Sequence, residues 1–220
     1  DYMTWKELDS KMSCYPLINF SDFEKIDNEY SDKINFLMLN TDDLEYLKKI
    51  KIPKNFVLIV QSNNEHYMSD IRTFFMQITE LDHPVIIYNN YEDISYENII
   101  VYSSTDLGGL FIQGFGDGIF ISSNQKQINE IEKINSLCFK ILQGSRVRVT
   151  STDFISCPSC GRTLFDLQET TKKIRDRTDH LKGLKIGIMG CIVNGPGEMA
   201  DADYGYVGSG KDKITLYRGK

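Results

Sequence analysis

The chain has 220 residues, of which 41% are hydrophobic and 25% charged, and its formal net charge is −6. Such a composition is typical of a soluble globular protein of one or two domains. The longest apolar runs, residues 56–60 and 184–189, are far shorter than the roughly 20 residues of a membrane-spanning helix, so we expect no membrane partner. Five cysteines without regular spacing argue against a secreted disulfide framework and favour a reducing compartment.

The charges are distributed unevenly along the chain. Residues 1–139 carry 11 Lys and Arg against 22 Asp and Glu, whereas residues 140–220 carry 14 against nine. A basic C-terminal part would attract phosphates or an acidic protein. Nucleic acid is the rival anion, but the basic residues lack interleaved aromatic side chains and any recognised binding module. We therefore expect no nucleic-acid partner.

The first part of the chain alternates short apolar runs with helix-like stretches. Near-continuous apolar runs are typical of strands covered on both faces, and they occur at residues 34–39, 56–61, 84–88, 99–102, 109–113 and 118–121. Helices are predicted at residues 41–49, with Thr41 as N-cap, at 69–81 and at 124–142. This order predicts an α/β domain with a parallel sheet. Five or six strands are too few for an eightfold barrel, so the sheet is expected to be open or a partial barrel.

A glycine-rich segment, Gly114-Phe-Gly116-Asp117-Gly118, lies between two of the predicted strands. It lacks the G-x-G-x-x-G spacing of a dinucleotide-binding loop, and a strand follows it where such a loop needs a helix. The segment therefore predicts a tight turn, in which Asp117 bonds to nearby backbone. A direct ligand role is the alternative.

A second domain is predicted from about residue 146. Gly144 is a plausible C-cap of the preceding helix, and residues 147–152 alternate polar and apolar side chains as an edge strand would. We thus predict a partial, barrel-like α/β domain at residues 1–145 and a smaller α+β domain at residues 146–220.

Within this second domain, three elements can be read from the sequence. An amphipathic helix is predicted at residues 164–181, a buried strand at 184–189 and a strand at 214–217. The apolar stripe of the helix comprises Leu164, Leu167, Ile174 and Leu181. The buried strand would deliver Cys191 to one end of the sheet.

Three cysteines and a glutamate form the most informative pattern in the chain. Cys157 and Cys160 enclose two residues, and Cys191 follows 30 residues later in Cys191-Ile-Val-Asn-Gly-Pro-Gly-Glu198. Thiolates suit iron-sulfur clusters or zinc. A carboxylate such as Glu198 in the fourth place would leave one iron with a harder, more easily displaced ligand, where substrate can bind.

Three other interpretations of the cysteines stay open at this point. A structural zinc site would need a fourth ligand, for which His180 is the nearest candidate. Cys157 and Cys160 could form a redox dithiol, which would leave Cys191 without a role. Inert buried cysteine is the third interpretation, and it suits Cys14 and Cys138 best.

The cysteine motifs also carry a resemblance to a known family. Residues 156–169 and 188–203 resemble 4-hydroxy-3-methylbut-2-enyl diphosphate synthase, the ferredoxin-dependent iron-sulfur enzyme of the non-mevalonate isoprenoid pathway. The resemblance is specific over residues 140–220, and residues 114–121 resemble the segment that precedes this domain. Residues 1 to about 80 match weakly and look like the extra domain inserted in the plant-like, three-domain form.

The resemblance implies an activity and a set of ligands. The family reductively opens 2-C-methyl-D-erythritol 2,4-cyclodiphosphate to 4-hydroxy-3-methylbut-2-enyl diphosphate, with single electrons from ferredoxin or flavodoxin. By this pattern Cys157, Cys160 and Cys191 hold three irons of a 4Fe-4S cluster, and Glu198 holds the fourth and yields it to substrate. Asn194 maps to a position near the substrate, although Asn is also a favoured turn residue before Gly195.

The resemblance also indicates what is missing. The family's substrate barrel, which supplies most diphosphate contacts and an acid/base glutamate, has no counterpart in this sequence. Because the sequence starts at Asp1, we expect it to be part of a longer polypeptide and inactive without a barrel in the same or a partner chain. The plant-like form implies a plastid-type organelle, either an apicoplast or a chloroplast stroma, with bacterial cytoplasm as the alternative. The alternative function is a non-catalytic electron-transfer or zinc domain.

Overall fold

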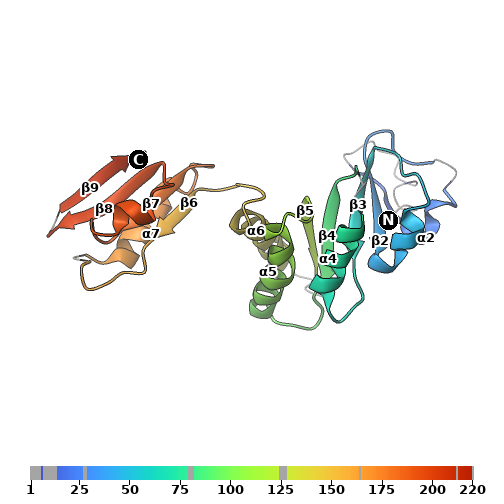
Figure 1. The fold of residues 1–220 in the computed structure, drawn as a ribbon, viewed down its shortest axis with the longest axis horizontal. Coiled ribbons are helices and arrows are strands. Elements are labelled where there is room, and N and C mark those ends of the chain that lie inside the picture. Colours follow the sequence, from blue (N-terminus) through green and yellow to red (C-terminus); the bar gives the residue numbers. More distant parts are fainter. Residues whose placement is uncertain are drawn as a thin grey trace. The chain divides into compact units, whose positions relative to one another are not determined.

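The computed structural model describes residues 6, 14–26, 29–78, 82–123, 128–163, 165–211 and 213–219, without the side chains of 128–130. The chain divides into two compact units, Asp1–Arg148 and Val149–Lys220 (Figure 1). No helix in the described ranges is both long and apolar enough to span a membrane.

The first unit is built on a parallel sheet of five strands. In sequence order they are β1 Leu17–Asn19, β2 Asn35–Asn40, β3 Phe56–Gln61, β4 Val85–Asn90 and β5 Gly118–Ser122. They neighbour one another in the same order, as in a segment of an α/β barrel. Within the described residues β1 and β5 each pair on one side, so the sheet is open. The predicted α/β architecture with a parallel sheet is confirmed.

Helices connect these strands. They are α2 Phe20–Phe23, the 3₁₀ turn η1 Thr41–Asp43, α3 Leu44–Leu47, α4 Tyr67–Gln77, α5 Tyr96–Ile112 and α6 Ile128–Gly144. The predicted helices at 69–81 and 124–142 correspond to α4 and α6, and residues 79–81 and 124–127 lie outside the described residues. The core between helices and sheet is apolar, with Phe56, Leu58, Ile71, Phe74 and Leu107 buried.

The N-cap predicted at Thr41 is wrong by one residue. Asn40 occupies that position, and its backbone N–H donates to Asp43 Oδ2 at 2.8 Å. Thr41 instead donates its hydroxyl hydrogen to Asp70 Oδ2 at 2.5 Å. Asp70 also accepts from Ser62 at 2.6 Å, so tertiary contacts decide the role of Thr41.

The strands predicted at residues 99–102 and 109–113 are wrong, because both segments lie in α5. This 17-residue helix begins after Ser95, whose side chain accepts a hydrogen bond from the Asn98 N–H at 3.3 Å. Each apolar run by itself is short enough for a strand. The N-cap and the burial of Ile99, Leu107 and Leu110 at helical spacing favour one continuous helix.

The junction after α6 also differs from the prediction. Arg146, and not Gly144, takes the left-handed conformation, with φ of 61°. The Arg146 N–H donates to the Gln143 carbonyl at 3.0 Å and the Val147 N–H to the Leu142 carbonyl at 2.9 Å, which is a Schellman cap. Residues 147–152 form no strand. Val147 and Val149 of this segment are exposed, whereas Thr152 is buried and its hydroxyl donates to the Thr178 carbonyl at 2.6 Å.

The second unit contains a smaller mixed sheet. Its strands, in spatial order, are β6 Asp153–Ser156, β7 Lys185–Met189, β8 Tyr204–Gly210 and β9 Lys213–Arg218. The first three are parallel and β9 is antiparallel to β8. The predicted strands at 184–189 and 214–217 are therefore confirmed, and β8 was missed. Its glycines hide the strand pattern, because glycine is rare in strands. Close packing requires glycine at position 208, where a Cβ would collide with the Gly190 carbonyl oxygen and lie 2.8 Å from Phe165 Cε1.

Two helices accompany this sheet, α7 Leu167–Thr178 and the short α8 Gly195–Glu198. The helix predicted at 164–181 corresponds to α7, and Leu164 lies outside the described residues. Leu167 and Ile174 of α7 pack with Ile186 and Ile188 of β7. Met189 and Val207 pack with Met199, just after α8. Alternating residues of β7 thus face two separate apolar clusters, which fixes where the strand ends.

Candidate functional site

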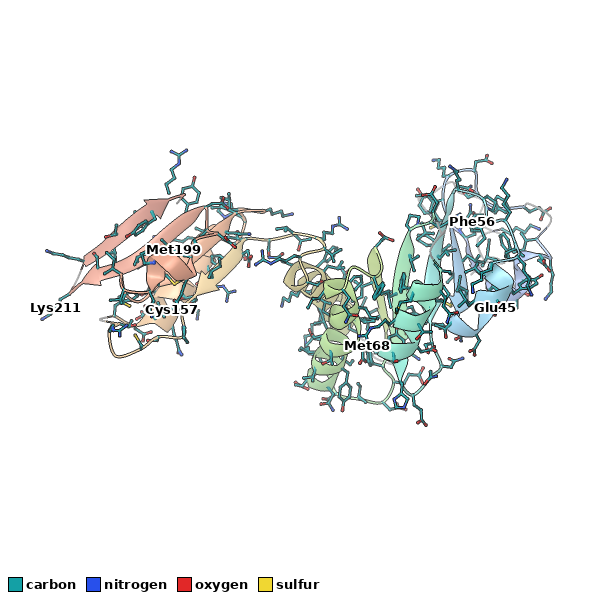
Figure 2. All side chains as sticks on the ribbon, in the orientation of Figure 1. Glu45, Phe56, Met68, Cys157, Met199 and Lys211 are labelled. Atoms are coloured by element: carbon teal, nitrogen blue, oxygen red, sulfur yellow. The ribbon has the colours of Figure 1, made fainter. Side chains whose placement is uncertain are left out.

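Two of the three cysteines of the motif follow the C-terminal ends of neighbouring parallel strands. Ser156, the last residue of β6, is in register with Ile188 of β7. The next residue, Cys157, donates its N–H to the Ile188 carbonyl at 3.3 Å. In return, the Gly190 N–H donates to Cys157 Sγ at 3.2 Å. The residue that precedes Cys191 is therefore bonded to the sulfur of Cys157. Figure 2 labels Cys157 within the second unit.

The third cysteine of the motif reaches the same place through a turn. Cys191 Sγ accepts hydrogen bonds from the backbone N–H groups of Asn194 and Val193, and it is also hydrogen-bonded to the Cys160 side chain. These amides, with a smaller contribution from the Arg162 charge, lower the pKa of the Cys191 thiol. The structure thus brings Cys157, Cys160 and Cys191 to one end of the sheet.

Tight backbone packing holds this end of the sheet together. A Cβ at Gly190 would collide with the side chain of Thr163, whose N–H donates to the Cys160 carbonyl at 3.0 Å. Ser159, inside the C-x-x-C turn, has a φ of 69°. A non-glycine residue in this region costs about 1 kcal/mol or more. Only glycine fits at position 190, because the two cysteine loops touch there.

Glu198 lies on the short helix that follows Cys191. Glu198 is the last residue of α8 and is exposed, and its N–H donates to the Asn194 carbonyl at 3.0 Å. Asn194 is exposed as well, at the N-cap of α8. Across the ranges that the structure describes, no three His, Cys, Asp or Glu side chains are gathered closely enough to hold a metal ion as they stand.

His180 lies at the opposite end of the second unit. It follows α7, and the next residues bond to the start of β6, where the Asp153 N–H donates to the Leu184 carbonyl at 2.9 Å. The whole of β7 separates this end from Cys191, a distance on the order of 15 Å at ~3.3 Å per residue. A zinc site completed by His180 is therefore disfavoured.

The two remaining cysteines belong to the first unit. Cys138 packs against its core, and burial raises the pKa of this thiol to about 11. Cys14 is exposed, so the buried setting expected for it is wrong.

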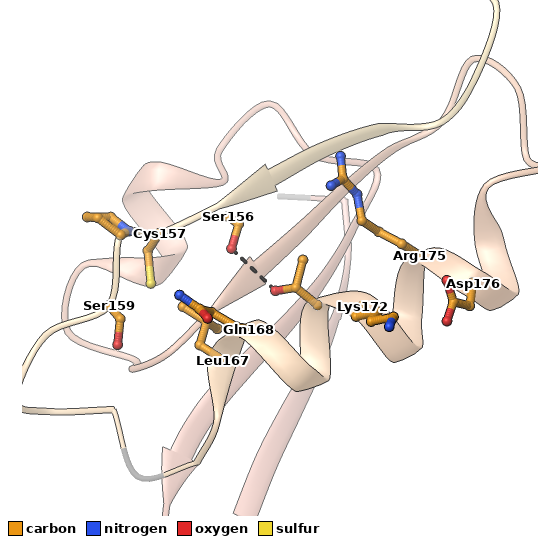
Figure 3. A pocket seen from close by; sticks show the side chains of 10 residues that line it. Ser156, Cys157, Ser159, Leu167, Gln168, Lys172, Arg175 and Asp176 are labelled. Carbon is orange, nitrogen blue, oxygen red and sulfur yellow. Dashed lines mark hydrogen bonds between the residues drawn. The ribbon is translucent and has the colours of Figure 1, made fainter.

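A pocket that sequence reasoning missed adjoins Cys157. It has a volume of about 440 Å³ and lies between β6, the C-x-x-C turn and α7 (Figure 3). Besides Cys157, its lining includes Gln168, Lys172, Arg175 and Asp176 of α7. The guanidinium of Arg175 lies 4.9 Å from the ring centroid of Phe154 in β6. Only the packing of α7 along β6 places these basic side chains beside a cysteine, and no local sequence signal reports it.

Comparisons with known proteins match both units. Residues 153–220 match the family model of the GcpE protein C-terminal domain. The chain is 41% identical over 223 residues to 4-hydroxy-3-methylbut-2-en-1-yl diphosphate synthase (flavodoxin) from Phocaeicola vulgatus, covering 100% of this chain and 36% of that protein. The protein of the same name from Bacteroides thetaiotaomicron is 46% identical over 198 residues, covering 87% and 32%. That from Chlorobaculum tepidum is 53% identical over 140 residues, covering 64% and 18%.

The similarity extends beyond the cysteine motifs. It includes residues 1–80, which the motifs alone match only weakly. The chain spans about a third of the length of the first of these curated relatives. Over its whole length the chain is similar to a segment of the Phocaeicola vulgatus synthase, and residues 153–220 match the model of the GcpE C-terminal domain.

Proposed function

We propose that the chain forms the C-terminal part of a 4-hydroxy-3-methylbut-2-en-1-yl diphosphate synthase and carries its 4Fe-4S cluster. The observation that carries this proposal is the convergence of the thiols, with the Gly190 N–H on Cys157 Sγ and Cys160 hydrogen-bonded to Cys191. The relatives bear this enzyme name over a region that includes the entire chain. The second unit would be the iron-sulfur domain, and the first unit the inserted domain of a plant-like, three-domain form.

The donor set fits an iron-sulfur cluster. Cys157, Cys160 and Cys191 would hold three irons, and the amides of Gly190, Val193 and Asn194 donate to their sulfurs. Such outer hydrogen bonds orient metal ligands and favour the thiolate form that binds iron. Glu198 would hold the fourth iron through a side-chain rotation from its exposed position on α8. When bound, the cluster supplies single electrons and Lewis-acid chemistry at that iron.

Other residues of the second unit would act on the substrate and its charge. Asn194 presents an exposed amide beside Cys191, where it can hydrogen-bond a substrate oxygen. The positive charge of Arg162 contributes to lowering the pKa of Cys191, and it would favour an anionic cyclic diphosphate at this edge. The remaining diphosphate contacts would come from a barrel domain of the same or a partner chain. Flavodoxin, which the relatives' names specify, or ferredoxin would deliver the electrons.

The proposal also implies a subcellular location. The relatives come from bacteria, which favours the bacterial cytoplasm. A plastid-type organelle, an apicoplast or a chloroplast stroma, is the location expected for a eukaryotic member of the plant-like form.

Anaerobic reconstitution of the chain with ferrous iron and sulfide tests the cluster. We expect the broad visible absorption of iron thiolates and, after reduction, an EPR signal. Cys157→Ser, Cys160→Ser and Cys191→Ser should each lose the cluster, whereas Cys14→Ser, at an exposed site of the first unit, should keep it. A colourless zinc protein, or full iron content in all three motif variants, would contradict the proposal.

A chimera tests the enzyme activity. The chain would replace the matching segment of the Phocaeicola vulgatus relative, which is 36% of that protein. With reduced flavodoxin, the chimera should convert the cyclic diphosphate to 4-hydroxy-3-methylbut-2-enyl diphosphate. A folded chimera with an intact cluster and no turnover would rule out this activity.

A further inference from the structure

We propose that the groove between β6 and α7 is the docking surface for an acidic electron-carrier protein, with Lys172 and Arg175 as its contacts. This inference rests on the proposed function, because it names the place where the donor of that reaction binds. It commits to a protein partner of negative surface charge. The argument combines the groove, its charges and its position beside Cys157.

The groove joins a basic helix face to a cysteine. Cys157, Lys172 and Arg175 line one pocket of about 440 Å³ (Figure 3). Gln168, Lys172 and Arg175 recur every three to four residues, so they form one face of α7. This face runs along β6, which is the edge strand of the sheet. The groove is therefore open toward a partner on the side away from β7.

The cations of this face are available to a partner. Lys173, which follows Lys172 in α7, forms an ion pair with Glu169 of the same helix, with 2.7 Å between Nζ and Oε1. In the described part of the chain, Lys172 and Arg175 form no ion pair, and both are exposed. Phe154 holds the Arg175 guanidinium in place at 4.9 Å. Asp176 is the one carboxylate that lines the groove, so the face keeps a positive balance.

Exposed charges of this kind suit a protein partner better than a small ion. Solvated cations contribute little to holding one anion, since solvent screens each contact. They raise the association rate of a partner that carries many opposite charges. The first unit is acidic and would not compete for the same partner, because residues 1–139 carry twice as many acidic as basic side chains. The charge pattern therefore favours an acidic protein at α7.

Cys157 connects the docking surface to the proposed cluster, because it lines the same groove. A carrier seated over Lys172 and Arg175 covers the groove that Cys157 lines. Its redox group would then face the sulfur that we assign to the cluster. Electron entry through Cys157 would leave Cys191, Asn194 and Glu198, on the loop after β7, to the substrate.

Cross-linking tests the contact without relying on turnover. The reconstituted chain would be mixed with a bacterial flavodoxin and treated with a carbodiimide, which couples lysine amines to carboxylates at direct contact. We expect cross-linked peptides at Lys172. Lys211 and Lys213 serve as the reference, because they lie at the β8–β9 hairpin, on the opposite edge of the sheet. Cross-links confined to that hairpin would overturn the proposal.

Anaerobic stopped-flow reduction provides the second readout. The double variant Lys172→Gln/Arg175→Gln should slow cluster reduction by flavodoxin about tenfold at low ionic strength, since two steering charges are lost. The matched double variant Lys211→Gln/Lys213→Gln removes the same charge and should slow it less than twofold. Arg175→Lys, which keeps the charge, should retain the rate. Dithionite should reduce all variants equally.

Each result separates this inference from the proposed function. Failure of the unmodified chain to take up a cluster would refute the proposed function. A cluster that flavodoxin reduces at the same rate in both double variants would refute the docking surface alone. Inorganic diphosphate binding that is lost in Lys172→Gln/Arg175→Gln, with an unchanged flavodoxin rate, would assign the groove to a small anion and also overturn it.

Discussion

The backbone N–H of Gly190 donates a hydrogen bond to the sulfur of Cys157 at 3.2 Å, across 33 residues of sequence. The bond exists because β6 and β7 are parallel and in register up to Ser156 and Ile188. Two cysteine loops that are remote in sequence therefore meet at one strand edge.

Substituting Gly190 by alanine should disrupt the site. An added Cβ would collide with Thr163, so the two cysteine loops would separate. Overpacking of this kind typically costs about 1–3 kcal/mol. We expect Gly190→Ala to lower iron content after reconstitution to a small fraction of the normal value, as measured by iron analysis and visible absorption.

Gly161→Ala is the matched control for this substitution. Gly161 follows the cysteine pair, has no heavy atom within 4 Å of an added Cβ and should load iron normally. Equal iron content in Gly190→Ala and Gly161→Ala would show that close contact between the loops is not required.

Replacing Glu198 tests the fourth ligand. In the chimeric enzyme, Glu198→Ala should leave a cluster with three cysteine ligands that readily loses one iron, and nearly all turnover should disappear. Glu198→Cys should preserve the cluster but block substrate, because a thiolate exchanges less readily than a carboxylate. EPR spectra and turnover measure both effects. Near-normal turnover and an unaltered spectrum in Glu198→Ala would place the fourth ligand elsewhere.

The pH dependence of alkylation tests the setting of Cys191. The amides of Asn194 and Val193, with the charge of Arg162, lower the pKa of this thiol. Its thiolate should therefore persist to lower pH than that of an ordinary cysteine, whose pKa is about 8.5, and reactivity should fall only below that range. Mass spectrometry of the cluster-free chain, treated with iodoacetamide across a pH series, gives the midpoint.

Cys138 is the internal control in the same samples, because its thiol pKa is raised where that of Cys191 is lowered. Burial raises its pKa to about 11, so its alkylation should stay slow through pH 9 while the first unit is folded. A Cys191 midpoint at or above that of an ordinary thiol would contradict the hydrogen-bonded arrangement.

Two glycines of the turn before β5 separate backbone strain from steric conflict. Gly114 and Gly116 have φ of 83° and 81°, but only a Cβ at Gly116 would clash, 2.7 Å from Ile87 Cδ1. Gly114→Ala should cost about 1 kcal/mol for the left-handed conformation. Gly116→Ala should cost a further ~1–3 kcal/mol through overpacking. Hydrogen exchange of the β4 and β5 amides in the intact chain measures both, and equal losses would disprove the clash.

The same turn shows where sequence reasoning succeeds. Its glycines predict a tight turn, and Gly114 and Gly116 adopt φ of 83° and 81° there. The Asp117 carboxylate, by contrast, accepts from the Val85 N–H at 2.9 Å, a residue 32 positions away, so its bond is a tertiary contact and not a local turn bond. The alternation of strands and helices in the first unit could also be predicted, because apolar strands and capped helices are local patterns. The cysteine spacing indicates a metal or cluster site by residue type alone, and that site stays a prediction.

Tertiary structure decided what local patterns leave ambiguous. The apolar runs at 99–102 and 109–113 suit a strand or a helix equally well, and packing against the core makes them one helix. The glycines of β8 conceal a strand that is defined by its pairing with β7 and β9. Glycine is required there because two loops and a methionine pack closely against the strand. Sequence by itself determined which residues are candidate ligands of a cluster, because that choice depends on residue type. Only the tertiary structure decided which of these residues meet, because such contacts depend on how distant segments pack. The register of β6 with β7 brings Gly190 to the Cys157 sulfur, and the packing of α7 against β6 places Arg175 in the same groove as Cys157.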